Sequence, residues 1–276
     1  MPILAPAGKL TDVPIIMHCP VALTIAGSDS GGGAGVQADL KTFAALGVHG
    51  ASATACLTAQ NPKRILAIES CSPNMLWRQI EAVFEEMPPA AVKTGMLFSV
   101  KNVSVVARFF EGKRHPLLVV DPVMVSTSGT MLLKPAAIKI LKEKLLPLAA
   151  LVTPNLHEAG VLIGREVASI EIMRAAAREI HARYGCATLV KGGHLRGMRE
   201  AADIFFDGRT ELLLTVPFIK GVRTHGTGCT CSAAITGFLA RGLDLPSAVK
   251  RAKQFITQAI AGSYRVGKHS VLNQRF

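Results

Sequence analysis

The feature that most constrains the fold is the alternation of short apolar runs with longer helix-like stretches. Runs such as VALTIAG (21–27) and PLLVVDPVM (116–124) are typical of buried strands, while VQADLKTFAALG (36–47) is typical of a helix. Strands that alternate with helices predict a mostly parallel central sheet flanked by helices on both faces. Residues 202–208 and 210–216, with Asp-Gly at the turn, predict a small antiparallel hairpin. The expected fold class is therefore α/β.

Two further runs near the N-terminus are expected to be strands. GASATACLTAQ (50–60) predicts one continuous second strand, and RILAIES (64–70) predicts a third. Residues 1–19 are interpreted as an N-terminal leader without ordered structure. No linker, repeat or low-complexity tract divides the rest, so residues 20–276 are predicted to form a single domain.

Composition narrows the classes of partner. The 276 residues are 49% hydrophobic, which is enough for one sizeable core. The formal net charge of +12 indicates either anionic partners or a basic surface without a specific role. Aromatic residues make up only 5%, so nucleic-acid binding is not expected. The six cysteines form no CxxC pair, and no apolar run has the length of a membrane span or a signal peptide. These features predict a cytoplasmic protein with free thiols and no membrane partner.

A glycine-rich turn leads into a predicted helix within RTHGTGCTCSAAITGFLARG (223–242). Gly226 and Gly228 let the backbone approach a ligand closely, and Cys229 falls near the first helical turn. A helix start offers unpaired N–H groups to an anion, and a thiol placed there is expected to ionise more readily than a free one. Cys229 could be a nucleophile, a proton acceptor, a phosphate ligand or a packing residue. Cys231, two residues further on, points to a different face of the helix and is predicted to be a packing residue.

Polar residues recur where the predicted strands end. They are Asp29, Lys93, Asp121, Asn155, Glu158 and Lys191. In an open parallel sheet, ligands bind outside the carboxyl ends of the strands, so these residues are either caps of the following helices or members of one site. After the first strand, SDSGGGAG (28–35) matches neither a Walker loop nor a dinucleotide fingerprint. Its glycines would let backbone N–H groups approach a ligand.

Three of these positions have competing interpretations. Asn155 and Glu158 lie three residues apart, so they could bind Mg²⁺ or form a capping box, and the spacing alone favours the capping box. Lys191, beside two glycines at a strand end, could bind a nucleotide phosphate or face solvent.

Several stretches, taken in order, resemble the hydroxymethylpyrimidine and phosphomethylpyrimidine kinases of thiamin biosynthesis, which belong to the ribokinase superfamily. They are residues 22–50, TAQN (58–61), VKTGML (92–97), VVDPVM (119–124), LVTPNLHEAG (151–160), VKGGH (190–194) and THGTGCTCSAA (224–234). The resemblance covers about 21–267. It implies a ribokinase-like fold, the use of ATP with Mg²⁺, and a homodimer. It also implies two successive phosphorylations of 4-amino-5-hydroxymethyl-2-methylpyrimidine.

The resemblance assigns a substrate pocket. Gln60 matches the glutamine that contacts the pyrimidine, and an amide can pair with an exocyclic amino group and its neighbouring ring nitrogen. Asp39 matches a second substrate-side residue. Ala34, Met96 and Val123 match the apolar walls.

The resemblance also assigns the phosphate side. Asp121 and Glu158 match the metal and phosphate region, acting on Mg²⁺ through waters. The residues implied to hold the nucleotide are Lys191, Asn155, Thr224, Gly226 and Gly228. The residues implied in phosphoryl transfer are Cys229, Gly226, Thr227, Gly228 and Lys191, with the turn from Gly226 to Cys229 forming an anion hole.

Many relatives in the superfamily have aspartate where this chain has Cys229. In the second phosphorylation the nucleophile is already an anion, which a fixed carboxylate would repel. A cysteine can instead be neutral near the phosphate or a thiolate near the alcohol. We therefore expect Cys229→Asp to impair the second step more than the first.

Two segments depart from the family pattern, and two other functions remain open. The tail VGKHSVLNQRF (266–276) and the basic stretch PKRILAIES (62–70) differ from the segments usual in the family. The alternatives are a pyridoxal or pyridoxine kinase on the same fold and a non-catalytic pyrimidine-binding regulator. Gln60 argues against the first, and the full set of phosphate-side residues argues against the second.

Overall fold

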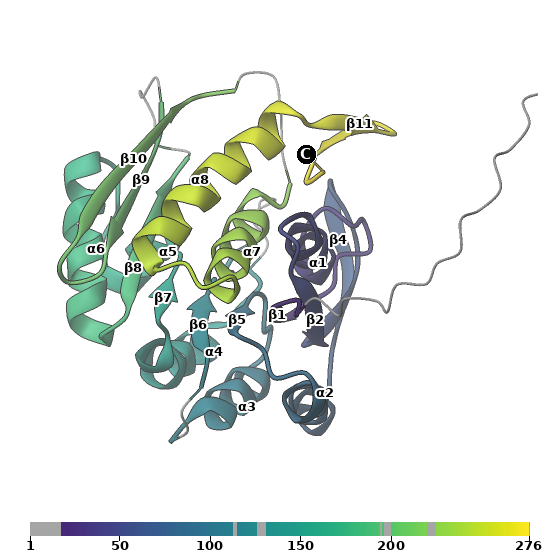
Figure 1. Cartoon of the computed structure of the whole chain (residues 1–276). Coiled ribbons are helices and arrows are strands. Elements are labelled where there is room, and N and C mark those ends of the chain that lie inside the picture. Colours follow the sequence, from purple (N-terminus) through teal and green to yellow (C-terminus); the bar gives the residue numbers. More distant parts are fainter. Residues whose placement is uncertain are drawn as a thin grey trace, which may run out of the picture.

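A central eight-stranded sheet confirms the predicted α/β architecture. The computed structural model describes residues 18–112, 115–125, 131–193, 195, 200–219 and 225–275. The strands lie in the order β10-β9-β8-β7-β6-β5-β1-β2 (Figure 1). Neighbouring strands run parallel in the part of the sheet made by β8, β7, β6, β5, β1 and β2. Their bounds are β1 Val21–Ala26, β2 His49–Thr54, β5 Ala91–Thr94, β6 Leu117–Val120, β7 Leu151–Val152, β8 Ala187–Gly192, β9 Glu200–Phe206 and β10 Glu211–Pro217.

Helices cover both faces of this sheet, as predicted. Helices α1 Gly35–Ala45, α7 Thr227–Ala240 and α8 Leu245–Ala261 pack on one face. The opposite face carries α2 Pro73–Glu86, α3 Val100–Phe110, α4 Pro135–Ile140, α5 Leu156–Ile163 and α6 Ile170–Tyr184 (Figure 1). Helix α4 continues as a π-helical turn, Leu141–Leu145, and a 3₁₀ turn, Leu146–Leu148.

The two helical layers explain why the strand runs are apolar without interruption. In β1, Ala22 packs toward the α7–α8 face, while Leu23 and Ile25 pack toward the opposite face. In β6, Val119 and Val120 are divided between the two faces in the same way. A strand buried on both faces needs apolar residues at successive positions, which is the pattern of a parallel sheet between helices.

The prediction of one continuous strand over 50–60 is wrong. Two strands are found: β2 pairs with β1 in the central sheet, whereas β3 (Cys56–Asn61) pairs with β4 (Arg64–Ser70) in a separate hairpin. The change occurs at Ala55, where neither glycine nor proline interrupts the apolar pattern. Ala55 and Cys56, where the chain passes from one sheet to the other, are both fully buried.

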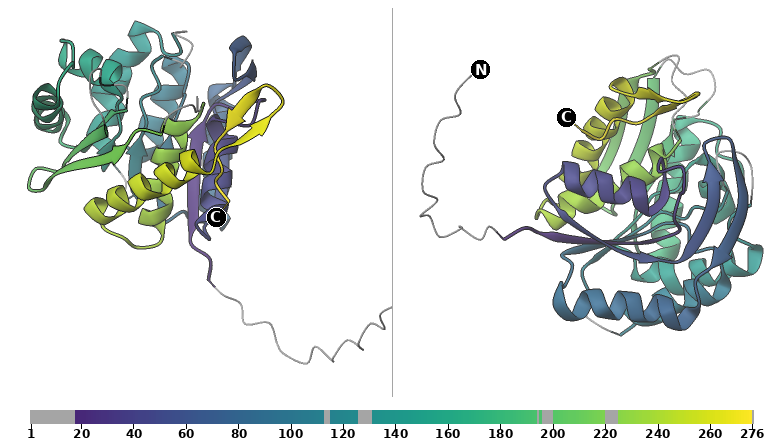
Figure 2. Two further views of the ribbon diagram at one scale, coloured as in Figure 1. Left: turned by 90° about the horizontal axis from the view of Figure 1, so that it is seen from above. Right: turned by 90° about the vertical axis from the view of Figure 1, so that its right-hand side faces the viewer.

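Two antiparallel elements complete the fold. Strands β9 and β10 form the predicted hairpin at one edge of the central sheet. After α8, a second hairpin is made by β11 (Tyr264–Val266) and β12 (His269–Val271), and it lies on the same side of the molecule as β3–β4 (Figure 2). The atypical tail then turns back, with Leu272 and Gln274 buried and Gln274 donating a hydrogen bond to Thr230 of α7.

Residues 1–17 of the expected leader lie outside the described residues, so the division into a leader and a single domain stays a prediction. Within the described part of the chain, no helix is both long and apolar enough to span a bilayer.

Candidate active site

The glycine-rich turn lies against the loop that follows β1. Gly226 is the N-cap of α7 with φ +89°, and a Cβ there would lie 1.8 Å from the carbonyl oxygen of Gly33. Only glycine therefore fits. A glycine N-cap has no side chain to satisfy the first N–H groups of α7, which leaves them available to an anion. The predicted helix start after the glycine-rich turn is confirmed, with Thr227 as the first residue of α7.

Lys191 and Asp121 form an ion pair beside this helix start. Lys191 Nζ donates to Asp121 Oδ1 at 3.1 Å, and Ser232 Oγ of α7 donates to Asp121 Oδ2 at 3.0 Å. A Cβ on Gly228 would lie 3.4 Å from Lys191 Nζ. Burial alone would lower the pKa of Lys191, but the carboxylates of Asp121 and Glu158 reverse this effect and raise it. A permanent cation therefore lies next to the glycine-rich turn.

The capping-box interpretation of Asn155 and Glu158 is confirmed. Asn155 Oδ1 accepts from the backbone N–H of Glu158, and Glu158 Oε2 accepts from that of Asn155, each at 2.9 Å. Glu158 Oε1 accepts from the Met124 N–H at 3.1 Å. Burial raises the pKa of Glu158, while Lys191 acts in the opposite direction. The cap fixes the Glu158 carboxylate near Lys191 and Asp121.

The two carboxylates fit a magnesium ion held through water. Asp121 and Glu158 are 3% and 2% exposed, and each of their four oxygens already accepts one hydrogen bond. A carboxylate oxygen has a second lone pair, so water bound to a metal can still donate to it. Mg²⁺ retains several waters and binds with one or two carboxylates and substrate phosphates. In the described residues, no cluster of three or more His, Cys, Asp or Glu could hold a metal directly.

Asp39 forms a fully buried ion pair with Lys93 of β5. Lys93 Nζ lies 2.8 Å from Asp39 Oδ2, which also accepts from Thr24 Oγ1 at 2.6 Å. Asp39 Oδ1 is buried and has no hydrogen-bond partner among the described residues. Burial opposes the charge on Lys93, but the Asp39 carboxylate outweighs it, so the pKa of Lys93 lies above its ordinary value. One buried acceptor thus remains for a ligand.

The expectation that Cys229 ionises readily is wrong. Burial and then the Asp39 carboxylate raise the pKa of the Cys229 thiol to about 11, although Lys93 acts to lower it. A hydrogen bond from the Gly35 backbone also favours the thiolate, but it is too weak to reverse the shift. The thiol is therefore neutral at physiological pH. Cys231 packs in the core on the α7–α8 face, as predicted.

The loop after β1 is organised around the Asp29 carboxylate. Asp29 is 1% exposed and accepts from the backbone N–H groups of Gly31, Gly33 and Ala34 at 2.8, 3.1 and 2.8 Å. Its Oδ2 also lies 3.0 Å from His225 Nε2. Burial would raise the pKa of Asp29, but the hydrogen bonds from His225 and the loop lower it below its ordinary value. The loop is thus fixed to the residue that precedes Gly226.

Gln60 lies at the same junction, on β3. Its amide nitrogen is 3.2 Å from His225 Nε2, and its backbone exchanges hydrogen bonds with the Ser30 hydroxyl at 2.7 and 2.8 Å. A register shift in the β3–β4 hairpin occurs between Ala59 and Gln60. The hairpin therefore brings the predicted substrate-binding amide to the loop after β1.

The predicted wall residues occupy different surroundings. Ala34 is buried as the N-cap of α1. A Cβ on Gly27 would lie 2.8 Å from Met96 Cε, which places Met96 over the end of β1. Val123 has φ +42°, a conformation that is rare for a β-branched residue and is concentrated at functional sites. Thr224 lies outside the described residues.

Sequence reasoning missed several residues of this site. Ser232 and Thr24 hold the carboxylates of Asp121 and Asp39, but hydroxyl residues within apolar stretches have no recognisable pattern. His225 lies in the glycine-rich stretch 223–242, and the sequence pattern gave it no role. Asp29 and Lys93 were recognisable only as polar residues at strand ends, and their position there was the available signal.

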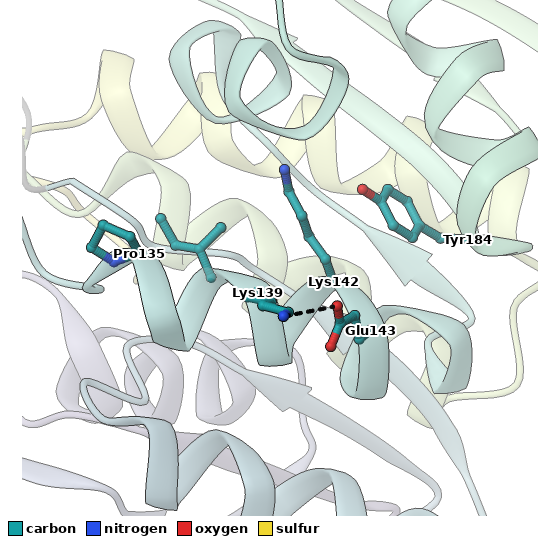
Figure 3. A pocket seen from close by; sticks show the side chains of 6 residues that line it. Pro135, Lys139, Lys142, Glu143 and Tyr184 are labelled. Carbon is teal, nitrogen blue, oxygen red and sulfur yellow. Dashed lines mark ion pairs between the residues drawn. The ribbon is translucent and has the colours of Figure 1, made fainter.

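A separate hollow of about 440 Å³ lies between α4, the π-helical turn and the end of α6 (Figure 3). The residues that line it are Pro135, Ile138, Lys139, Lys142, Glu143 and Tyr184. Lys139 pairs with Glu143 at 4.0 Å, and Lys142 Nζ donates to the Val161 carbonyl at 2.6 Å. Of the predicted site residues that the structure describes, none lines this hollow.

Comparisons with known proteins match most of the chain. The family model of phosphomethylpyrimidine kinase matches residues 29–273. The chain is 50% identical over 251 residues to the hydroxymethylpyrimidine/phosphomethylpyrimidine kinase of Rhizobium meliloti (strain 1021), covering 89% of this chain and 92% of the relative. It is 39% identical over 246 residues to the Bacillus subtilis (strain 168) protein of that name, covering 89% and 91%.

Two solved kinase structures are similar to this chain in fold. An ADP complex of Bacillus subtilis pyridoxal kinase superposes with a TM-score of 0.87 at 36% identity, covering 93% of this chain and 98% of the other. Phosphomethylpyrimidine kinase from Clostridium difficile 630 gives a TM-score of 0.78 at 42% identity, covering 87% and 99%.

The fold and the relatives together define a kinase with the ribokinase-like architecture that the sequence predicts. Within that class, the chain belongs to the phosphomethylpyrimidine kinase family.

Proposed function

We propose that this protein uses ATP to phosphorylate 4-amino-5-hydroxymethyl-2-methylpyrimidine to its monophosphate and then to its diphosphate in thiamin biosynthesis. The observation that carries the proposal is the family match over 29–273, which includes both the substrate-side and the phosphate-side residues. The first step requires attack by an alcohol on the γ-phosphate, and the second requires attack by the new phosphate. Phosphoryl transfer depends mainly on positioning and charge neutralisation, so one site can serve both steps.

The substrate side recognises an aminopyrimidine. Gln60 offers one acceptor and up to two donors, and Asp39 Oδ1 is a buried acceptor with no partner among the described residues. An exocyclic amino group next to a ring nitrogen supplies the matching donor and acceptor. Ala34, Met96 and Val123 exclude water around the ring.

The phosphate side neutralises the transferring group. The N–H groups at the start of α7, from Gly226 to Cys229, face the phosphate, and Lys191 supplies a fixed positive charge. Asn155 and Thr224 contribute to nucleotide binding. Mg²⁺, held through water by Asp121 and Glu158, would supply further charge neutralisation when bound. Cys229, as a neutral thiol, adds no negative charge where the substrate monophosphate must bind.

A pyridoxal kinase activity is the second candidate. The favouring observation is the TM-score of 0.87 at 36% identity with the Bacillus subtilis pyridoxal kinase. Pyridoxal has no exocyclic amino group beside its ring nitrogen, so it cannot use both ends of the Gln60 amide as the aminopyrimidine does. We therefore place this activity second.

The test is mass analysis of products formed with ATP, MgCl₂ and hydroxymethylpyrimidine, with pyridoxal in a parallel reaction. Pyrimidine monophosphate and diphosphate support the proposal. Product from pyridoxal alone identifies the second candidate. Tight pyrimidine binding without ATP turnover identifies a non-catalytic regulator.

We also propose a cytoplasmic homodimer. All six cysteines are free thiols, which suits a reducing compartment. Leu57 and Leu66 of the β3–β4 hairpin are 59% and 62% exposed, and Leu57 belongs to the apolar stretch ATACLTA (53–59). Exposed leucines on a hairpin suit burial against a second copy. Sedimentation of the wild type and of Leu57→Lys tests this: a dimer that the substitution dissociates supports the proposal, and a wild-type monomer contradicts it.

A further inference from the structure

His225 connects two elements that converge beside the glycine-rich turn. Its Nε2 lies 3.0 Å from Asp29 Oδ2 and 3.2 Å from the atom assigned as the amide nitrogen of Gln60. Asp29 follows β1, Gln60 is on β3, and His225 precedes α7. One ring nitrogen therefore contacts both a carboxylate and an amide.

The Asp29 carboxylate determines whether His225 Nε2 carries a hydrogen. Asp29 is almost fully buried, and its oxygens accept from three backbone N–H groups. Those contacts favour the ionised carboxylate, which can only accept hydrogen bonds. At 3.0 Å from Oδ2, His225 Nε2 must therefore carry a hydrogen.

The protonated nitrogen in turn decides the orientation of the Gln60 amide. A ring nitrogen that carries a hydrogen cannot accept a bond from an amide NH₂. The oxygen and nitrogen of an amide have nearly the same shape, and their assignment follows from the hydrogen-bond network. Rotating the Gln60 amide by half a turn places Gln60 Oε1 against His225. The N–H at His225 Nε2 is then shared between Asp29 Oδ2 and Gln60 Oε1.

We propose that His225, fixed by Asp29, is a positioning residue that holds the Gln60 amide in one orientation for aminopyrimidine recognition. This inference rests on the proposed function. In this orientation Gln60 Oε1 keeps a second lone pair for the exocyclic amino group of the substrate. The Gln60 amide nitrogen directs its hydrogens toward the ring nitrogen of the pyrimidine. Without His225, the amide could rotate and oppose donor to donor and acceptor to acceptor. A site built to hydrogen-bond a substrate group discriminates strongly against an analogue that lacks it.

The test compares two substrates across three proteins. The substrates are hydroxymethylpyrimidine and the same compound without its 4-amino group. The proteins are the wild type, His225→Phe and the matched control His49→Phe, since His49 is exposed at the start of β2. We expect His225→Phe to reduce the preference in kcat/KM for the amino compound by about tenfold or more, mainly through its KM. The KM for ATP and the control's preference should not change.

Equal losses on both substrates, with an unchanged preference, would mean that His225 is only structural and would overturn the proposal. His225→Gln, which keeps an N–H donor, should recover part of the preference. If both variants fail to fold, ¹⁵N NMR of the wild-type histidines decides: a protonated His225 Nε2 supports the assignment, and an unprotonated one overturns it. A wild-type enzyme without hydroxymethylpyrimidine turnover would instead refute the proposed function itself.

Discussion

Lys93 Nζ lies 2.8 Å from Asp39 Oδ2, and both side chains are completely removed from solvent. Removing one member of a buried pair leaves the other charge uncompensated, which costs about 3–5 kcal/mol. We expect Lys93→Met to lower the free energy of unfolding by this amount, measured by urea denaturation. Lys93→Met combined with Asp39→Leu should recover most of the loss. A loss below about 1 kcal/mol for Lys93→Met alone would show that the pair is not a charged interaction.

Gly226 and Gly242, at opposite ends of α7, provide a matched pair of substitutions. Both have positive φ, at +89° and +87°, but a Cβ meets the Gly33 carbonyl at Gly226 and no atom of the described residues within 4 Å at Gly242. Gly242→Ala should cost only the conformational strain, about 1–2 kcal/mol of stability, with normal kcat. Gly226→Ala should displace the turn and reduce kcat by about 100-fold. Similar kcat values for the two variants would refute the role of this turn.

The raised pKa of Cys229 predicts its reactivity. With a pKa of about 11, the thiol is protonated in all but about one molecule in 10⁴ at pH 7. Because the thiolate is the nucleophile, alkylation by iodoacetamide should rise about tenfold per pH unit from pH 7 to 10. Peptide mass spectrometry measures this rate, with the exposed Cys19 as the accessible control. A rate that levels off near pH 7 would show that Cys229 is already ionised.

Substituting Cys229 by aspartate tests why a thiol stands in the anion-binding turn. Cys229→Asp places a fixed charge near Asp39 and Asp121, and it should repel the monophosphate substrate more than the uncharged alcohol. We expect kcat/KM to fall at least about tenfold more for the second phosphorylation than for the first. Separate assays that start from the alcohol and from the monophosphate measure the two losses, with Cys229→Ser as the uncharged control. Equal losses in the two steps would refute this explanation.

Asp121 provides a test of the proposed metal position. Asp121→Asn keeps the size of the side chain but removes the charge that faces Lys191. We expect the Mg²⁺ concentration for half-maximal activity to rise about 10-fold or more, with normal secondary structure by circular dichroism. Magnesium titration at saturating ATP measures it. An unchanged requirement would place the metal elsewhere.

Much of the fold was predictable because the apolar pattern has a simple cause. Strands buried on both faces must be apolar throughout, and β1 and β6 therefore stand out in the sequence. The boundary between β2 and β3 was not predictable, because Ala55 is neither a glycine nor a proline. The alternation of side chains in this stretch suits either sheet. Pairing between distant strands decides that boundary.

The site was predictable in part, for a different reason. Strand-end positions and the family resemblance identified Asp121, Glu158 and Lys191, whose mutual contacts follow from the parallel sheet. The protonation state of Cys229 was not predictable. It depends on burial and on Asp39, which is brought near only by the packing of α1 against α7. The orientation of Gln60 likewise depends on Asp29 and His225, which are 196 residues apart in the sequence.

Under the proposed function, one site catalyses two successive phosphorylations. The most direct measurement is a time course of products from hydroxymethylpyrimidine with excess ATP and MgCl₂, with wild type and Gly226→Ala compared. If one site serves both steps, monophosphate should rise first and then fall as diphosphate accumulates, and the substitution should slow both phases. Monophosphate that accumulates without any diphosphate, or a substitution that slows only one phase, would contradict it.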